Sequence, residues 1–214
     1  MELPRTLPER VYLLAYNRDK QRLTARDRLG ELTRAAALVE LGWRGLIADD
    51  NGKVAATGTT TGDPVLAAVL ADIAGSSKPR SWKRWIARGG RHTGAAVRTS
   101  LESGGWVRVE HHRILGLIPS TRVTVRDPRV LTRLQSGVTR TLGGDPVTRL
   151  DRMDTAAAAL AAAALAAAAK LGTVMPRARR RDHRQRITEL TEHTGPAAGA
   201  LRQAIRDKEA AAAG

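Results

Sequence analysis

The residues of this chain that are best suited to chemistry are its arginines. Thirty of its 36 basic residues are Arg, and the 214-residue chain carries a net charge of +15. A guanidinium group binds phosphate through two parallel hydrogen bonds, whereas a Lys ammonium acts as a point charge. Such a charge favours an anionic partner, either nucleic acid or an acidic membrane surface. The coding bias of a GC-rich bacterial genome is the alternative explanation of the arginine excess.

Catalytic and metal-binding chemistry has little support in the residue pattern. The chain has no Cys, which excludes disulfides, thiolate catalysis and Cys-ligated zinc. Adjacent His111 and His112 would point to opposite faces of a strand, and a solvated turn explains them better than a metal pair does. The segments GSSKPR and GGRHTG match neither common phosphate-binding loop. We therefore expect a binding protein that is not an enzyme, with no metal and no cofactor.

Helix start signals indicate which elements position the arginines. At residues 63–64, 127–128 and 145–146, an Asp that can cap a helix precedes a Pro at the first helical position. These pairs predict helices at 64–74, 128–142 and 146–171. Apolar periodicity, glycine stops and a Ser81 cap predict further helices at 28–42, 81–88, 94–103, 182–192 and 197–209. Residues 11–16 fit either a strand or the first turn of a helix, and the last Ala-rich residues are expected to fray.

The alanine-rich run at 156–169 is too short to cross a bilayer. As a helix it would measure about 21 Å, against a hydrocarbon core of about 30 Å. Alanine is the best helix former, and its small side chain lets neighbouring helices approach closely. The run is interpreted as a buried central helix, with a low-complexity surface helix as the alternative.

Two β-hairpins are predicted, each after a helix, a glycine and a Trp. The first pairs residues 43–48 with 53–57 through an Asp-Asn-Gly turn. The second lies within 106–125, with its tight turn near Glu110–His112. A helix followed by a small hairpin is the outline of a winged DNA reader, with arginines on the DNA phosphates. It also fits a lipid-binding protein in which clustered arginines hold a headgroup while an apolar hairpin touches the bilayer.

The composition of the hairpins separates these two hypotheses. The segment Ile114–Pro119 reads ILGLIP and is apolar on both strand faces, so it is either buried or directed at lipid. In the first hairpin, Asp49 and Asp50 would repel a DNA phosphate. Both observations favour the lipid hypothesis.

Four sequence blocks resemble the Golgi phosphoprotein 3 family in their order and spacing. They read LVELGWRGLI, TGDPVLAAVLADI, SLESGGWV and ILGLIPSTRVTVRDP, and the resemblance covers residues 8–175. The resemblance implies a mainly α-helical domain around a central apolar helix, a place that the alanine run occupies. It also implies recognition of phosphatidylinositol 4-phosphate and peripheral membrane attachment. In eukaryotic members it further implies binding of glycosyltransferase tails and coat proteins, and these Golgi roles do not transfer to a bacterial host.

The resemblance also implies site residues, and the carry-over is partial. The family's headgroup arginines match Arg34 and Arg91, while a third matches Gly94, for which Arg98 one turn further on can substitute. A Trp that flanks the pocket in eukaryotic members falls near Ala25 or Arg26, and Arg26 is taken as a further basic candidate. The apolar hairpin thought to enter the bilayer matches the residues Leu115, Leu117 and Ile118.

The sequence thus predicts a mainly α fold: a single compact helical domain over 1–214, around a central Ala-rich helix, with two small β-hairpins. Residues 177–214 form its basic helical C-terminal part, with six Arg between 177 and 186. We expect a cytoplasmic protein attached peripherally to the inner face of the membrane. Its candidate partners are an anionic phospholipid, membrane-protein tails and further copies of the chain. A winged-helix nucleic-acid binder is the alternative.

Overall fold

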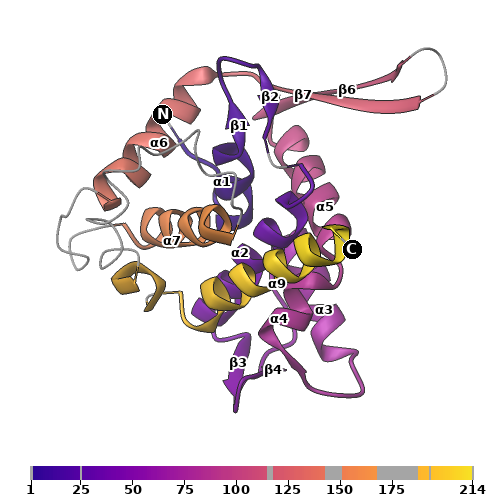
Figure 1. Cartoon of the computed structure of the whole chain (residues 1–214), viewed down its shortest axis with the longest axis vertical. Coiled ribbons are helices and arrows are strands. Elements are labelled where there is room, and N and C mark those ends of the chain that lie inside the picture. Colours follow the sequence, from indigo (N-terminus) through magenta and orange to yellow (C-terminus); the bar gives the residue numbers. More distant parts are fainter. Residues whose placement is uncertain are drawn as a thin grey trace.

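Helices dominate the chain and the sheets are small. The computed structural model describes residues 2–24, 26–114, 118–142, 151–167, 188–192 and 194–213. Within these residues the strands form two two-stranded sheets and one three-stranded sheet, all antiparallel. The mainly α fold class with small hairpins is confirmed (Figure 1). The elements are α1 (Leu7–Leu14), β1 (Tyr16–Asn17), β2 (Arg22–Leu23), α2 (Leu29–Trp43), β3 (Ile47–Asp50), β4 (Lys53–Ala56), α3 (Pro64–Ala74), β5 (Arg80–Ser81), α4 (Trp82–Ala87), α5 (Gly90–Ser103), β6 (Val107–Ile114), β7 (Ile118–Val125), α6 (Pro128–Leu142), α7 (Arg152–Ala167) and α9 (Pro196–Ala213).

The predicted caps start three of the described helices, α3, α4 and α6. The Asp63 carboxylate accepts a hydrogen bond from the backbone N–H of Leu66 at 2.8 Å, and α3 covers the predicted residues. Asp127 precedes α6 in the same way and accepts from the N–H of Arg129 at 2.9 Å. Ser81 caps α4. Each helix begins there because a side-chain oxygen satisfies a backbone N–H that has no partner within the helix.

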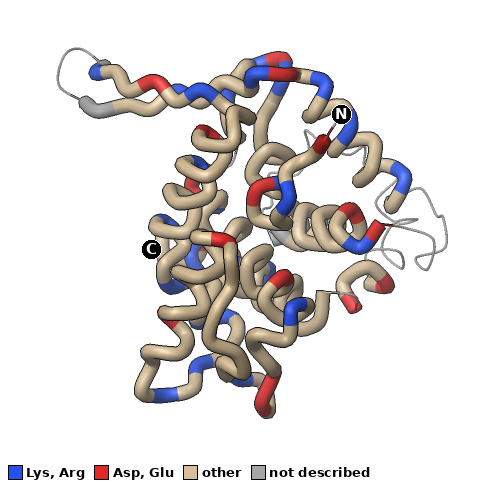
Figure 2. The backbone as a smooth tube through the Cα atoms, turned by 180° about the vertical axis from the view of Figure 1, so that it is seen from behind, with Lys and Arg blue, Asp and Glu red and all other residues tan. Residues whose placement is uncertain are grey.

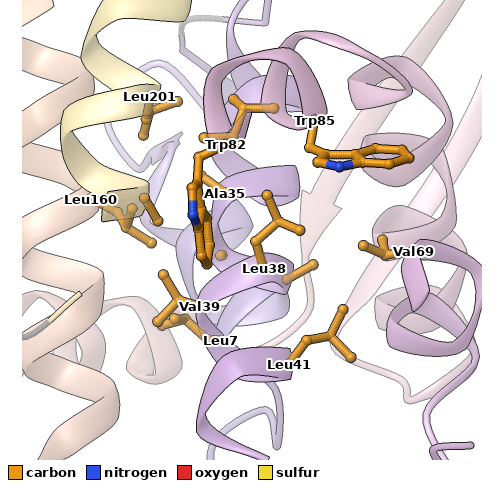
Figure 3. Close-up of a cluster of buried hydrophobic side chains, with 14 of the residues drawn as sticks. Leu7, Ala35, Leu38, Val39, Leu41, Val69, Trp82, Trp85, Leu160 and Leu201 are labelled. Atoms are coloured by element: carbon orange, nitrogen blue, oxygen red, sulfur yellow. The ribbon is translucent and has the colours of Figure 1, made fainter. Parts of the chain in front are cut away.

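Helix α2 lies at the centre of the fold. It packs against α1, α3, α4, α5, α7 and α9, and every residue from Thr33 to Leu41 is buried. Figure 3 shows Leu38, Val39 and Leu41 on α2 among side chains from the surrounding helices. Three consecutive alanines, Ala35–Ala37, keep its surface small enough for neighbours on all sides. The predicted central position therefore belongs to α2.

The alanine-rich helix α7 is buried, as the sequence predicted, but it lies to one side of α2. One face, with Ala156, Ala157 and Leu160, joins the main core. The other face, with Ala158 and Ala159, packs against a second group around Leu190. The described helix begins at Arg152, after Asp151, whose carboxylate accepts from the N–H groups of Met153 and Asp154. The predicted Asp-Pro start at 145–146 lies outside the described residues, as does the predicted end at 171.

The second hairpin is longer than predicted, and its predicted turn is wrong. Strands β6 and β7 pair continuously from Val107↔Val125 to Ile114↔Ile118, so Glu110–His112 lies within β6. The error arose because three consecutive exposed polar residues resemble a turn. Nearer the body, Val107 and Val123 are buried and hold the strands against the helices. The hairpin projects from the helical body (Figure 1).

The first hairpin is short and is attached to the body. Strands β3 and β4 are joined by a third strand, β5, and the indole N–H of Trp82 donates to the Asp49 carboxylate. Ile47 and Val54 are buried beneath it. The predicted β-segment 43–48 is wrong in its first residues, because α2 continues to Trp43.

The C-terminal part ends in a helix that continues to Ala213, so the expected fraying of the final alanines is wrong. Residues 188–192 are helical within the predicted 182–192 segment. The basic segment 177–186 lies outside the described residues. Helix α9 packs on α2, α4 and α7, and its buried side chains Leu201 and Ile205 belong to the main core.

Candidate functional site

An open pocket of about 1330 Å³ lies where several elements meet. Its walls come from the N-terminal ends of α2 and α5, from α4, from α9 and from β7. This volume exceeds the roughly 300–1000 Å³ of usual small-molecule pockets. The pocket is thus wide enough to admit a phosphorylated sugar headgroup from the protein surface.

Basic side chains gather in this pocket, and its acidic side chains are already neutralised. The basic residues in the described lining are Arg26, Lys83, Arg84, Arg91, Arg98 and Lys208. Lys208 donates to the Glu31 carboxylate at 2.6 Å, and Lys83 donates to Asp207 at 2.9 Å. Asp27 lies 3.7 Å from Arg28. An anion entering the pocket therefore meets acidic groups whose charge is compensated.

Four arginines of the pocket have no such compensation: within the part of the chain that the structure describes, Arg26, Arg84, Arg91 and Arg98 form no ion pair with a carboxylate. Unpaired guanidinium groups that share one pocket repel one another, and a bound anion would relieve that repulsion. Each can form charge-assisted hydrogen bonds with phosphate oxygens. By its charge, the pocket therefore favours an anion.

Two helix N-termini meet at the wall of the same pocket. Helices α2 and α5 approach through Gly30 and Gly90, so closely that a Cβ added to Gly30 would lie 2.6 Å from the carbonyl carbon of Gly90. No side chain caps either helix. Their first backbone N–H groups and the positive ends of their dipoles therefore favour an anion at this point. Helix α5 begins earlier than predicted because Gly89 turns the chain with a φ of +77°.

Tyr12 adds a neutral hydrogen-bond donor to the lining. Its side chain is 2% exposed, and burial raises the pKa of Tyr12 to about 12, although Arg98 and Arg26 act in the opposite direction. The hydroxyl therefore keeps its proton at neutral pH and can donate to an anion. It comes from α1, so the pocket combines groups from both ends of the sequence.

Arg34 does not line the pocket, and its placement corrects the expectation that it contacts a headgroup directly. The side chain is 2% exposed. Its guanidinium donates to Asp72 at 2.9 Å, to the Thr93 hydroxyl at 3.2 Å and to the Trp85 carbonyl at 3.3 Å. Burial lowers the pKa of Arg34, and the hydrogen bond to Asp72 raises it in opposition. Arg34 thus uses its donors inside the protein.

The position of Arg34 still bears on the pocket. Its guanidinium lies beneath the Gly89 turn, where an added Cβ would come within 3.3 Å of it. Thr93, in the first turn of α5, accepts one of its hydrogen bonds. Arg34 therefore contacts the start of α5 from inside the protein and helps to fix its position.

The structure brings the remaining predicted arginines together. Arg26, Arg91 and Arg98 line one pocket, as does Gly94. Sequence reasoning missed Arg84 and Tyr12. The basic SWKRWIAR helix was the available signal for Arg84, because Lys83 and Arg84 are its only charged residues before the final turn. Nothing in the sequence indicated Tyr12 as a pocket residue, since an aromatic residue in an apolar helix is expected to lie in the hydrophobic core.

Of the predicted membrane-contacting residues, Ile118 begins β7 at the outer end of the β6–β7 ladder. Leu115 and Leu117 lie outside the described residues. Further along β7, Ser120, Thr121 and Val123 line the pocket. The hairpin therefore leaves the body directly beside the pocket, and in Figure 1 it extends on the same side as the C-terminal end of α9.

Arg side chains also line the hairpin. β6 and β7 carry Arg108, Arg113 and Arg122 against a single acidic residue, Glu110, and Figure 2 shows this basic excess along the projecting strands. Among the described helices, none has the length and apolarity needed to cross a bilayer. A search of the same residues found no group of His, Asp and Glu side chains that could hold a metal ion.

These features define a mainly helical protein with a strongly basic pocket beside a projecting hairpin. A family model for Golgi phosphoprotein 3 (GPP34) matches residues 7–208. The chain belongs to the Golgi phosphoprotein 3 family. A comparison with curated proteins found none that matches it.

Proposed function

We propose that this protein binds the headgroup of an anionic phospholipid, of the phosphatidylinositol 4-phosphate type, in the arginine pocket. The observation that carries the proposal is the meeting of four unpaired arginines with two uncapped helix N-termini. A monophosphoinositide headgroup supplies several negative charges, and each arginine contact is worth about 1.5–3 kcal/mol. Guanidinium and backbone N–H groups bind phosphate without a nucleophile or a base, so the proposed activity is binding and not catalysis.

The hairpin supplies the second part of the proposed attachment. Three residues separate Thr121, which lines the pocket, from Ile118 at the outer end of β7. That separation corresponds to about 10 Å along a strand. Apolar segments that lie in a membrane interface reach a depth of about 5–10 Å. A headgroup in the pocket and apolar hairpin residues in the acyl boundary are therefore geometrically compatible.

Several weak terms together give reversible, peripheral attachment. Two or three inserted apolar side chains add a few kcal/mol at about 25 cal/mol per Å². Each basic residue near an anionic surface adds about 1 kcal/mol. In a bacterial cell, the proposed location is the cytoplasmic face of the membrane.

Sedimentation with vesicles tests this function. Phosphatidylcholine vesicles containing phosphatidylinositol 4-phosphate are compared with vesicles containing phosphatidylserine at equal charge, with duplex DNA as competitor. We expect binding to the phosphoinositide vesicles, which Arg91→Ala combined with Arg98→Ala weakens. Arg202→Ala is the matched control, because Arg202 is an exposed arginine of α9 outside the pocket lining.

A second pair of variants tests the hairpin. Leu117→Asp should abolish vesicle binding while the circular dichroism spectrum is unchanged, and Leu117→Ile should retain it. Binding to DNA alone, or vesicle binding that survives both the double arginine variant and Leu117→Asp, would overturn the proposal.

A further inference from the structure

A smaller groove shares Arg26 with the pocket. It has a volume of about 260 Å³ and lies between the turn that joins β1 to β2 and the hairpin. We call it the β2–β7 groove. The side chains that define it are Lys20, Gln21, Arg22, Arg26, His112 and Arg122.

The charge in this groove is of one sign. In the described part of its lining there is no Asp or Glu. Lys20, Arg22 and Arg122 form no ion pair within the described residues. Glu110 stands opposite Arg122 in the strand ladder, but its carboxylate pairs with Arg108 at 3.2 Å. Cations that line one groove without a carboxylate partner repel each other, and a bound anion would reduce that repulsion.

The β1–β2 side of the groove is built by a tightly held turn. The Asn17 side chain accepts from the N–H of Lys20 at 2.7 Å, and the Arg18 carbonyl accepts from the N–H of Gln21 at 3.3 Å. Gln21 has a φ of +45°, which is uncommon for a residue with a side chain. Such a conformation persists only where the surroundings enforce it. Lys20 and Arg22 are therefore presented by a fixed turn, which lies next to β7.

We propose that the β2–β7 groove binds the phosphate of a second anionic phospholipid, of the singly charged diester type such as phosphatidylglycerol. The groove shares Arg26, Ser120 and Thr121 with the pocket, so both open beside the same strand of the hairpin. A membrane that inserts the hairpin would present headgroups to both at one depth. The groove is about one fifth of the size of the pocket, which suits a phosphodiester rather than a phosphorylated sugar. This inference rests on the proposed membrane attachment, but not on recognition of the 4-phosphate.

Three vesicle compositions separate the two sites. The first contains phosphatidylcholine with phosphatidylinositol 4-phosphate, the second contains phosphatidylcholine with phosphatidylglycerol, and the third contains both anionic lipids. Arg22→Ala with Arg122→Ala removes the groove and leaves the arginines of the pocket in place. Lys53→Ala with Lys78→Ala removes the same charge from exposed positions outside both linings. Lys53 lies in β4, at the end of the molecule opposite the hairpin (Figure 1).

The groove variant should bind phosphatidylglycerol vesicles about 30-fold more weakly than the unmodified protein, from two basic residues at the surface. Its binding to vesicles with phosphatidylinositol 4-phosphate alone should fall by a smaller factor, since the pocket that holds that headgroup is intact. The lysine control should match the unmodified protein, because its charges lie beyond the roughly 10 Å screening length at about 0.1 M salt.

Arg22→Lys with Arg122→Lys distinguishes a site from a general field. The charge is kept, and the paired hydrogen bonds of guanidinium to phosphate are lost. We expect this variant to lose part of the phosphatidylglycerol binding. The inference is overturned if it binds like the unmodified protein, if the groove and lysine variants weaken binding equally, or if the groove variant loses only DNA binding. Absence of phosphatidylinositol 4-phosphate binding in every protein would instead contradict the proposed function.

Discussion

Arg34 and Arg91 were predicted for the same role, yet the fold places them in opposite environments. Arg34 is 2% exposed and donates three hydrogen bonds inside the protein. Arg91 is exposed, lines the pocket and has no ion-pair partner in the described structure. A buried guanidinium requires partners, because desolvation is costly. An exposed one can leave its donors to water until a ligand arrives. The predicted site arginines therefore divide into one that is used inside the protein and others whose donors face the pocket.

The largest expected effect concerns the partner of the buried arginine. Asp72→Ala leaves the Arg34 charge buried without its carboxylate, a change that costs about 3–5 kcal/mol in a fully buried pair. Since the Asp72 side chain is 56% exposed, we expect the lower range of about 2–4 kcal/mol in the free energy of unfolding. Urea denaturation measures it.

Asp50→Ala is the matched control for that experiment. The Asp50 carboxylate is exposed and accepts a hydrogen bond from its neighbour Asn51, so its loss should change stability by no more than about 0.5 kcal/mol. Equal effects of Asp72→Ala and Asp50→Ala would show that Arg34 does not depend on its carboxylate.

For the exposed arginines of the pocket, we expect a substitution to change vesicle affinity and not stability. Arg91→Ala should leave the free energy of unfolding within about 0.5 kcal/mol of its original value. Its affinity for phosphoinositide vesicles should fall by about 1.5–3 kcal/mol, or roughly 10- to 150-fold. Denaturation and vesicle sedimentation on the same preparation check both. A variant that is destabilised but binds normally would reverse the division between the two groups.

Gly30 of α2 and Gly90 of α5 form a close backbone contact at the wall of the pocket. Gly30→Ala places a Cβ against backbone atoms that cannot rotate away, so stability should fall by about 1–3 kcal/mol. Gly42→Ala, in the same helix and with no atom within 4 Å of the new Cβ, should raise stability by about 0.5–1 kcal/mol. Thermal denaturation compares them. If both substitutions stabilise, the close approach of α2 and α5 is wrong.

The smallest effect concerns pH and Tyr12. Because the folded-state pKa is raised to about 12, the unfolded chain loses this proton first, near its ordinary value of about 10. Stability is therefore lost as pH rises through this window, by about 1 kcal/mol at roughly pH 11. Tyr12→Phe should remove that loss. The measured quantity is the difference in unfolding free energy between the two proteins at neutral pH and near pH 11. A difference that does not vary with pH would contradict the buried, neutral phenol.

Much of the fold could be predicted because its signals are local. The Asp-Pro caps of α3 and α6, the Ser81 cap of α4 and the alanine-rich α7 each depend on residues within one or two turns of each other. The position of the hairpin turn could not be predicted, because the consecutive exposed polar residues Glu110–His112 resemble a turn until the partner strand is known. The start of α5 was missed because it depends on the backbone of Gly89.

The candidate site was only partly predictable. The family resemblance supplied Arg91, and the basic composition supplied the class of ligand. Arg84 and Tyr12 enter the pocket from α4 and α1, and no periodicity connects those helices in the sequence. Whether an arginine is paired depends on carboxylates that are distant in sequence, such as Asp72 for Arg34, 38 residues away.

By itself, the sequence determined the charge of this protein, its family and most of its helices. These properties follow from composition and from interactions between near neighbours in the chain. Only the tertiary structure decided which arginines form hydrogen bonds inside the protein and which face the open pocket. It also decided that two helix N-termini meet at one pocket beside the hairpin. The physical reason is that desolvation and ion pairing depend on what surrounds a charge in space, and that environment is assembled from distant parts of the chain.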